Sequence, residues 1–214
     1  MIAYDPISGN VWSDAISYNP HSCFIMTQLG QKVPPSIKEV RDVVEKCLER
    51  KHFKVIDAGS STTGRDFLVK IWRLILSVPL GIAIVCEGMK PSTLENIYFE
   101  LGVMQALGKE TVLVKVGNIE CATDLIRTEY IEAPDLGAKI NKFLTTCITQ
   151  AKQYQDLSTE TKDKNPLVAL DYMERAFLIT NNPSYKKVLL QTVLSSSYYD
   201  KIVQNEIAGL LLKT

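Results

Sequence analysis

The sequence predicts a three-layer α/β domain with a parallel sheet, followed by a C-terminal helical extension. Short apolar runs alternate along the chain with segments whose apolar residues recur at helical spacing. Residues 80–86 form a continuous apolar run, which is typical of a strand buried on both faces. Strands that alternate with helices form parallel βαβ units with short, right-handed crossovers. The expected strand order is therefore flavodoxin-like.

The spacing of the apolar residues predicts where each strand and helix lies. Strands are expected within residues 21–30, 53–57, 80–86, 111–116 and 130–133, and helices over 37–50, 67–77, 93–107 and 136–151, with a short helical turn at 124–127. The first 20 residues carry three Pro and Gly residues and are expected to form an arm over the domain, docked by Trp12.

The chain divides into three parts. Residues 21–152 form the α/β domain, and the polar, charged stretch 153–166 is interpreted as a linker. Helices are expected over 167–180, 184–196 and 199–212, within a helical extension that covers 167–214. A helical extension with its leucines exposed would be unstable alone. These helices should therefore pack on the first domain or on another copy of the chain.

Composition limits the classes of function. Lys and Arg number 24, as do Asp and Glu, which disfavours a nucleic-acid binder that works by a net positive field. No apolar run has membrane-spanning length, and the N-terminus lacks the pattern of a signal peptide, so we expect a cytoplasmic protein without a membrane partner. Five single cysteines and two histidines indicate neither a disulfide framework nor a metal site, and no cofactor is expected.

The stretch 92–108 carries the strongest local pattern. Ser92 and Glu95 have the spacing of a capping box, and Gly108 stands where a helix commonly ends. Glu100 lies beside the apolar stripe of this helix, so its carboxylate should sit at the edge of a packed surface. It is either a half-exposed helical glutamate, which is common, or a catalytic acid that partial burial tunes. Because Glu100 lies about two turns down this helix, it borders a cleft at the strand ends only if the helix lies along that cleft.

Ligands of doubly wound sheets bind outside the carboxyl ends of the strands. The segments expected there are residues 27–29, which include Thr27 and Gln28, the loop 57–65, and residues 86–93. The loop 59–64 is rich in Gly, Ser and Thr and precedes Arg65, so it is either a phosphate cradle at a helix N-terminus or an ordinary capped loop. It is not a Walker loop, and no GxGxxG fingerprint follows a strand.

Several segments together resemble a known group of proteins. They are residues 66–77, 81–87, 96–102, 106–109 and 111–114, with Cys23-Phe-Ile-Met-Thr-Gln as a matching first strand. An Asn-x-x-x-Glu-Leu-Gly helix followed by Ala-Leu-Gly-Lys and a strand resembles the nucleoside 2-deoxyribosyltransferase-like group and the related bacterial TIR-like domains. The resemblance covers about residues 21–147.

The resemblance implies cleavage of an N-glycosidic bond between a ribose carbon and a base. It assigns Glu100 as the carboxylate that attacks the anomeric carbon or stabilises its cation, with Asn96 orienting that carboxylate or binding a ribose hydroxyl. The family often ends its third strand with Asp, whereas Cys86 stands here and Glu87 follows. The expected substrate-binding residues are Thr27, Gln28, Gly59, Ser60, Arg65, Asp66, Glu87 and Lys90.

Three functions are consistent with these observations. The first is an N-glycosidase that acts on NAD or a related nucleotide or nucleoside. The second is a catalytically weak nucleotide-sensing module that signals through oligomerisation by its C-terminal helices, which the missing strand-end Asp favours. The third is a scaffold with a vestigial cleft. We expect a homo-oligomer.

Overall fold

The chain forms a five-stranded, all-parallel sheet in the part that the computed structural model describes, residues 4–12, 16–30, 33–60, 67–119, 130–132 and 135–195. The strand order is β2-β1-β3-β4-β5, which confirms the predicted flavodoxin-like α/β fold. The strands are β1 (Ser22–Met26), β2 (Lys54–Ile56), β3 (Leu80–Cys86), β4 (Glu110–Val116) and β5 (Tyr130–Glu132).

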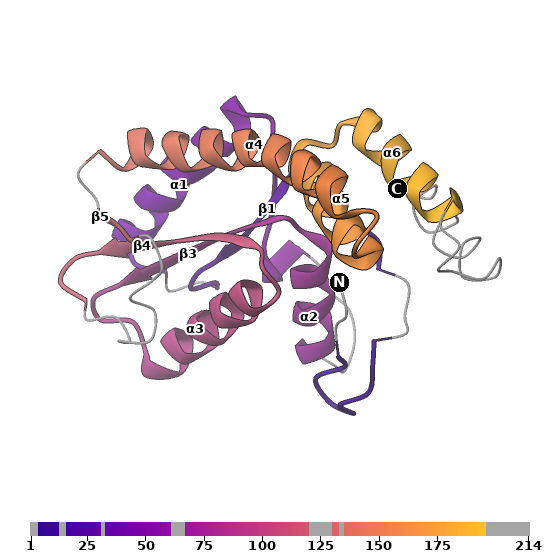
Figure 1. Cartoon of the computed structure of the whole chain (residues 1–214). Helices are drawn as coiled ribbons and strands as arrows, with labels where there is room; N and C mark the ends of the chain where they lie inside the picture. Colours follow the sequence, from indigo (N-terminus) through magenta and orange to yellow (C-terminus); the bar gives the residue numbers. More distant parts are fainter. Residues whose placement is uncertain are drawn as a thin grey trace.

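Helices cover both faces of this sheet. α1 (Pro35–Arg50) and α4 (Leu136–Thr161) contact each other on one face. α2 (Phe67–Ser77) and α3 (Pro91–Ala106) contact each other on the opposite face, so the domain has three layers (Figure 1). The crossover connections of the parallel strands therefore lie on both faces, as in other doubly wound sheets.

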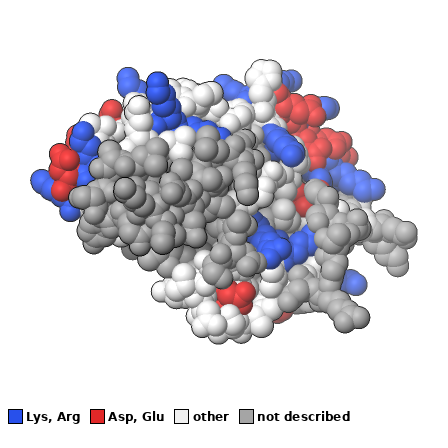
Figure 2. All heavy atoms as spheres, turned by 90° about the vertical axis from the view of Figure 1, so that its right-hand side faces the viewer, with Lys and Arg blue, Asp and Glu red and all other residues white. Residues whose placement is uncertain are grey.

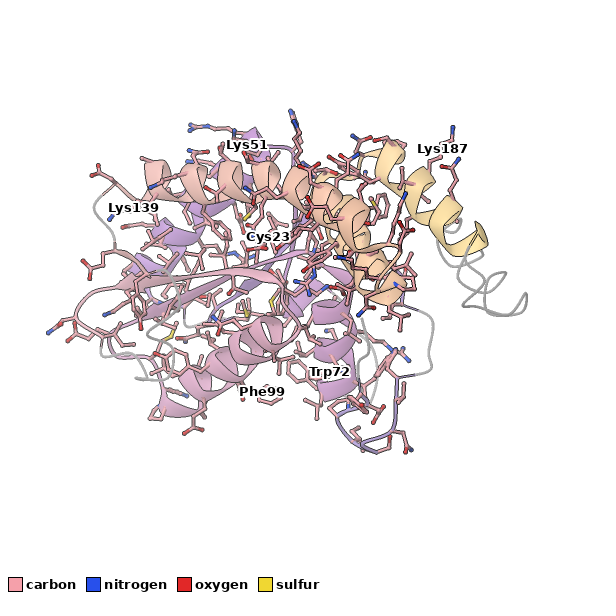
Figure 3. The ribbon with its side chains drawn as sticks, viewed as in Figure 1. Cys23, Lys51, Trp72, Phe99, Lys139 and Lys187 are labelled. Carbon is pink, nitrogen blue, oxygen red and sulfur yellow. The ribbon has the colours of Figure 1, made fainter. Side chains whose placement is uncertain are left out.

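Strand β3 is the centre of the core. All seven of its residues are buried, as the continuous apolar run predicts. It pairs with β1 through Cys23↔Leu80 to Met26↔Ala83 and with β4 through Leu80↔Glu110 to Cys86↔Val116. Cys23 lies in the interior of the same sheet with no exposed surface (Figure 3).

The start of α3 differs from the prediction. The helix begins at Pro91, Lys90 is its N-cap residue, and no side chain caps its first turn. The Ser92–Glu95 capping box is therefore wrong, because proline's fixed φ suits the first helical position and starts the helix one residue before Ser92. At the other end the helix closes as expected, with Gly108 in the left-handed region at φ +66°.

The predicted linker is largely helical. α4 continues without a break to Thr161, so the helix does not end near Ala151. Ala151, Tyr154 and Ser158 are buried at helical spacing, and the Ser158 hydroxyl donates a hydrogen bond of 2.8 Å to the carbonyl of Ala169. The stretch is polar in composition, but one of its faces packs against the following helix, and this contact determines its structure.

Two further helices follow α4. α5 (Pro166–Thr180) starts with Asn165 as a side-chain N-cap, and α6 (Pro183–Ser195) packs on it through Leu189 and Met173. The helical turn expected at 124–127 and the helix expected at 199–212 lie outside the described residues.

The helical extension packs on the amino edge of the sheet. The backbone N–H of His21, just before β1, donates to the carbonyl of Leu178 at 2.6 Å, and the guanidinium of Arg175 donates to the carbonyl of Gly108 before β4. α5 therefore packs on the α/β domain, the first of the two arrangements expected. On the face that carries α5 and α6, acidic and basic side chains of the described residues are interspersed (Figure 2).

The N-terminal arm packs on α2, where the Arg73 guanidinium lies 5.6 Å from the ring of Trp12. Within the described residues, no helix is both long and apolar enough to cross a bilayer.

Candidate functional site

The carboxyl ends of β2, β1 and β3 lie side by side at one edge of the sheet, because the three strands are parallel neighbours. The residues that follow these strands are Asp57, Thr27 and Glu87. The helical extension packs on the opposite edge, so α5 does not cover the strand ends. This edge is where an open parallel sheet binds its ligands.

Glu100 is a half-buried carboxylic acid on α3. Its neighbours Ile97, Leu101 and Met104 are buried against the sheet, which holds this part of the helix in place. Burial raises the pKa of the Glu100 carboxyl from 4.5 to about 7, because the charged form loses hydration that nothing fully replaces. Ionised and neutral forms are therefore both present near pH 7, which suits a group that exchanges protons or faces a developing cation.

The residues beside Glu100 are more exposed. Asn96, one helical turn earlier, is an exposed side chain, and Phe99 is 51% exposed and points away from the sheet (Figure 3). Glu100 therefore stands between the buried stripe of α3 and its solvent-facing surface.

Thr27 connects the ends of the two central strands. Its hydroxyl donates a hydrogen bond of 3.3 Å to the carbonyl of Ile84 in β3. Gln28, the next residue, is half-buried. Both residues lie at the end of β1, where the sequence placed them.

Glu87 and Lys90 are exposed in the turn between β3 and α3. The Glu87 carboxylate accepts the backbone N–H of Asn118 at 3.4 Å and lies over Gly117, whose φ is +78°. This contact holds Glu87 against the loop that follows β4. Cys86 is only 2% exposed, and burial raises the pKa of its thiol, so it is a core residue and not a nucleophile.

One basic side chain holds the loop after β2. Gly59 and the backbone of Ser60 belong to the short 3₁₀ helix η1 (Ala58–Ser60), and the ammonium of Lys70 donates to the carbonyl of Ala58 at 2.7 Å. The side chain of Ser60, and all of Arg65 and Asp66, lie outside the described residues.

One pair at this edge was not singled out from the sequence. Arg41 Nη2 of α1 lies 2.6 Å from Asp57 Oδ2 at the end of β2, and Arg41 Nε lies 2.6 Å from Glu45 Oε1. The topology predicted that Asp57 would be at a strand end. No local pattern connects it to Arg41, which belongs to the preceding helix.

Among the described residues, no three His, Cys, Asp or Glu side chains gather closely enough to hold a metal ion. Comparison with models of known protein families and with curated proteins finds no match. The fold and the site define a class, a flavodoxin-like α/β protein with a half-buried carboxylic acid on the helix after its central strand.

Proposed function

We propose that the protein cleaves the bond between base and ribose in NAD or a related nucleotide or nucleoside. The observation that carries this proposal is the Glu100 carboxyl, which burial holds at a pKa of about 7 on a helix packed against the central strands. Structural ion-pair networks also perturb pKa values, but here burial is the cause. The sequence motif around Glu100 resembles that of the N-glycosidase group described above.

In the proposed reaction, the bond between the anomeric carbon and the base nitrogen breaks, and its electron pair leaves with the base. The ribose carbon becomes positively charged, and the ionised Glu100 stabilises or attacks it, as carboxylates do in glycoside hydrolysis. Water then adds to the carbon, gives a hydroxyl and releases a proton. A poorly hydrated carboxylate attracts this cation more strongly than a solvated one does, because the local dielectric constant is lower.

The remaining site residues have supporting roles in this proposal. Asn96 orients the carboxylate or binds a ribose hydroxyl. Thr27, Gln28 and Glu87 border the reacting sugar at the ends of β1 and β3, and Lys90 steers the anionic substrate. The loop with Gly59, Ser60, Arg65 and Asp66 binds the substrate. We propose that the protein acts in the cytoplasm.

The test is to incubate the protein with NAD and a panel of nucleosides and to separate the products by chromatography. Free base should accumulate with the wild type and be lost in E100Q, which keeps the size of the side chain but cannot ionise. E95Q is the matched control, because Glu95 is an exposed glutamate on the same helix. Base release by E100Q at the wild-type rate excludes this role for Glu100.

A second candidate function is nucleotide sensing without turnover, in which the C-terminal helices transmit binding through a homo-oligomer. The observation that favours it is Cys86, a buried thiol at the strand end where the related enzymes often carry Asp. Calorimetry that detects NAD binding, together with a change in sedimentation and no product after long incubation, supports sensing over catalysis.

A further inference from the structure

The indole N–H of Trp72 is a buried hydrogen-bond donor on α2. Its nitrogen, Nε1, is shielded from solvent, and no group in the described part of the chain accepts its hydrogen. A buried tryptophan N–H usually has a hydrogen-bond partner, because an unpaired donor loses its hydration without replacement. An acceptor that this N–H can reach is therefore expected close to α2.

The carboxyl of Glu100 on α3 is the matching acceptor. Burial causes its raised pKa, and no described residue contributes a hydrogen bond or a charge to that shift. An ionised carboxylate has about four lone-pair positions that accept hydrogen bonds, and such bonds stabilise the charged form. Trp72 lacks an acceptor and Glu100 lacks a donor, so each group offers what the other needs.

Trp72 lies on the flank of α2 that faces α3. Ile71 is buried, and the side chains of Lys70 and Trp72 project about 100° to either side of it around the helix axis. The Lys70 ammonium donates to the carbonyl of Ala58 after β2 at 2.7 Å, so its flank faces the β2 edge of the sheet. The opposite flank, with Trp72, therefore faces α3, which contacts α2 (Figure 1).

Glu100 lies on the flank of α3 that faces α2. Leu101 has no exposed surface, and the side chain of Glu100 projects about 100° to one side of it. Gln105 lies to the other side of Leu101 around the axis, and its amide donates to the hydroxyl of Thr111 in β4 at 3.3 Å. Because β4 lies beyond β3 from β1 and β2, the Gln105 flank faces away from α2 and the Glu100 flank faces toward it.

The two side chains also lie at similar heights along the sheet. Leu80 at the start of β3 and Glu110 at the start of β4 are register partners. Trp72 precedes Leu80 by eight residues and Glu100 precedes Glu110 by ten, so their heights differ by about 3 Å on parallel helices. Packed helices have axes about 8–10 Å apart, which the two long side chains together can span.

Among the described residues, the charged side chains of α2 and α3 near this pair are directed elsewhere. Lys70 binds a carbonyl on the opposite flank, and the guanidinium of Arg73 lies 5.6 Å from the ring of Trp12. Glu95 of α3 is exposed, and β3 beneath the helices is apolar throughout. A hydrogen bond from the indole to Glu100 would therefore form in apolar surroundings, where water weakens it little.

We propose that the indole N–H of Trp72 donates a hydrogen bond to the ionised Glu100 carboxylate, which makes Trp72 a positioning residue of the site. The bond forms when Glu100 loses its proton, because a hydrogen bond to a charged acceptor is roughly twice as strong as one between neutral groups. It favours the ionised form that the reaction uses. The effect on catalysis rests on the proposed N-glycosidase function, whereas the hydrogen bond itself does not.

Proton NMR of the indole groups tests the hydrogen bond without any turnover. The chain has two tryptophans, so the resonance that W72F lacks identifies Trp72 in the wild type. This resonance should move downfield as the pH rises through the range near 7 in which Glu100 ionises, because a carboxylate acceptor deshields the proton. It should not titrate in E100Q and should titrate as in the wild type in E95Q. A resonance that titrates in E100Q, or that does not titrate in the wild type, overturns the proposal.

The pH profile of base release tests the consequence for the site. W72F keeps an aromatic ring but removes the N–H, which should raise the pKa of Glu100 by about one pH unit. Its kcat/KM should therefore be about five- to tenfold below that of the wild type at pH 6 and within about twofold of it at pH 9. The control W12F removes the other indole and should keep the wild-type profile. An equal loss at pH 6 and pH 9 would show that Trp72 has only a structural role.

This proposal and the proposed reaction fail separately. If no compound of the panel loses its base but the Trp72 resonance titrates with Glu100, the N-glycosidase proposal fails and the hydrogen bond stands. If base is released and the Trp72 resonance does not titrate, the reaction stands and Trp72 does not position Glu100.

Discussion

The thioether of Met104 occupies the space that a β-carbon on Gly81 would need. Gly81 lies in the buried central strand β3, and Met104 lies on the inner face of α3 with no exposed surface. The glycine therefore allows α3 to approach the sheet closely, one helical turn after Glu100. The position of the proposed catalytic carboxylate depends on this contact between helix and strand.

G81A should destabilise the protein by about 1–3 kcal/mol, because the added methyl group overpacks the core and forces Met104 to move. Urea unfolding of the two proteins measures the difference. G102A is the matched control on α3: a β-carbon at Gly102 meets nothing within 4 Å, so this variant should gain about 0.5–1 kcal/mol from helix propensity. Equal stability of G81A and the wild type would show that Met104 adapts without cost.

E100Q should be more stable than the wild type at alkaline pH. The folded-state pKa of Glu100 is raised from 4.5 to about 7, so the folded protein binds the proton more tightly than the unfolded chain does. Above pH 7 both states carry the charge, and its burial costs about 1–3 kcal/mol that glutamine avoids. The advantage of E100Q should shrink as the pH falls from 7 to 4.5 and vanish below that range. Thermal unfolding at pH 5 and pH 8 measures it, and a pH-independent difference contradicts it.

The sequence predicts the central part of the fold well because its signals are local. The run 80–86 matches β3 residue for residue, since a strand buried on both faces needs apolar side chains throughout. α4 is longer than predicted, because Tyr154 and Ser158 are polar residues that α5 buries. A single sequence does not show such a contact between helices.

The same reasoning applies to the candidate site. Glu100 was recognisable from its place beside an apolar stripe, which is a property of one helix. Asp57 and Arg41 come from different elements, and the turn from α1 into β2 brings them to within 2.6 Å. Only the folded chain shows that the Asp57 carboxylate is held by the guanidinium of Arg41.

His21 should contribute strongly to the packing of the helical extension. Its ring nitrogens lie 2.7 Å from the carbonyl oxygen of Ile179 at the end of α5 and 2.9 Å from that of Lys51 after α1, and its ring stacks on Phe53 at 3.8 Å. H21N keeps a residue that tolerates the left-handed backbone but shortens the side chain, and should lose about 1–2 kcal/mol.

The second histidine provides the control. His52 also has a positive φ, +60°, but it is exposed. H52N should therefore lie within about 0.5 kcal/mol of the wild type in urea unfolding. If H21N and H52N are equally stable, the contacts of the His21 ring do not hold the extension on the sheet.

Base release should depend on the ionisation of Glu100. The carboxylate must be charged to stabilise or attack the ribose cation, and its pKa in the free protein is about 7. The value of kcat/KM should therefore rise with pH by about tenfold per unit below pH 6 and level off above pH 8, because this ratio reports the ionisation of the free enzyme. E100D, which keeps a carboxylate on a shorter side chain, should retain a dependence of this form at a lower rate. A rate that falls as the pH rises through 7 would assign Glu100 the role of a proton donor to the leaving base.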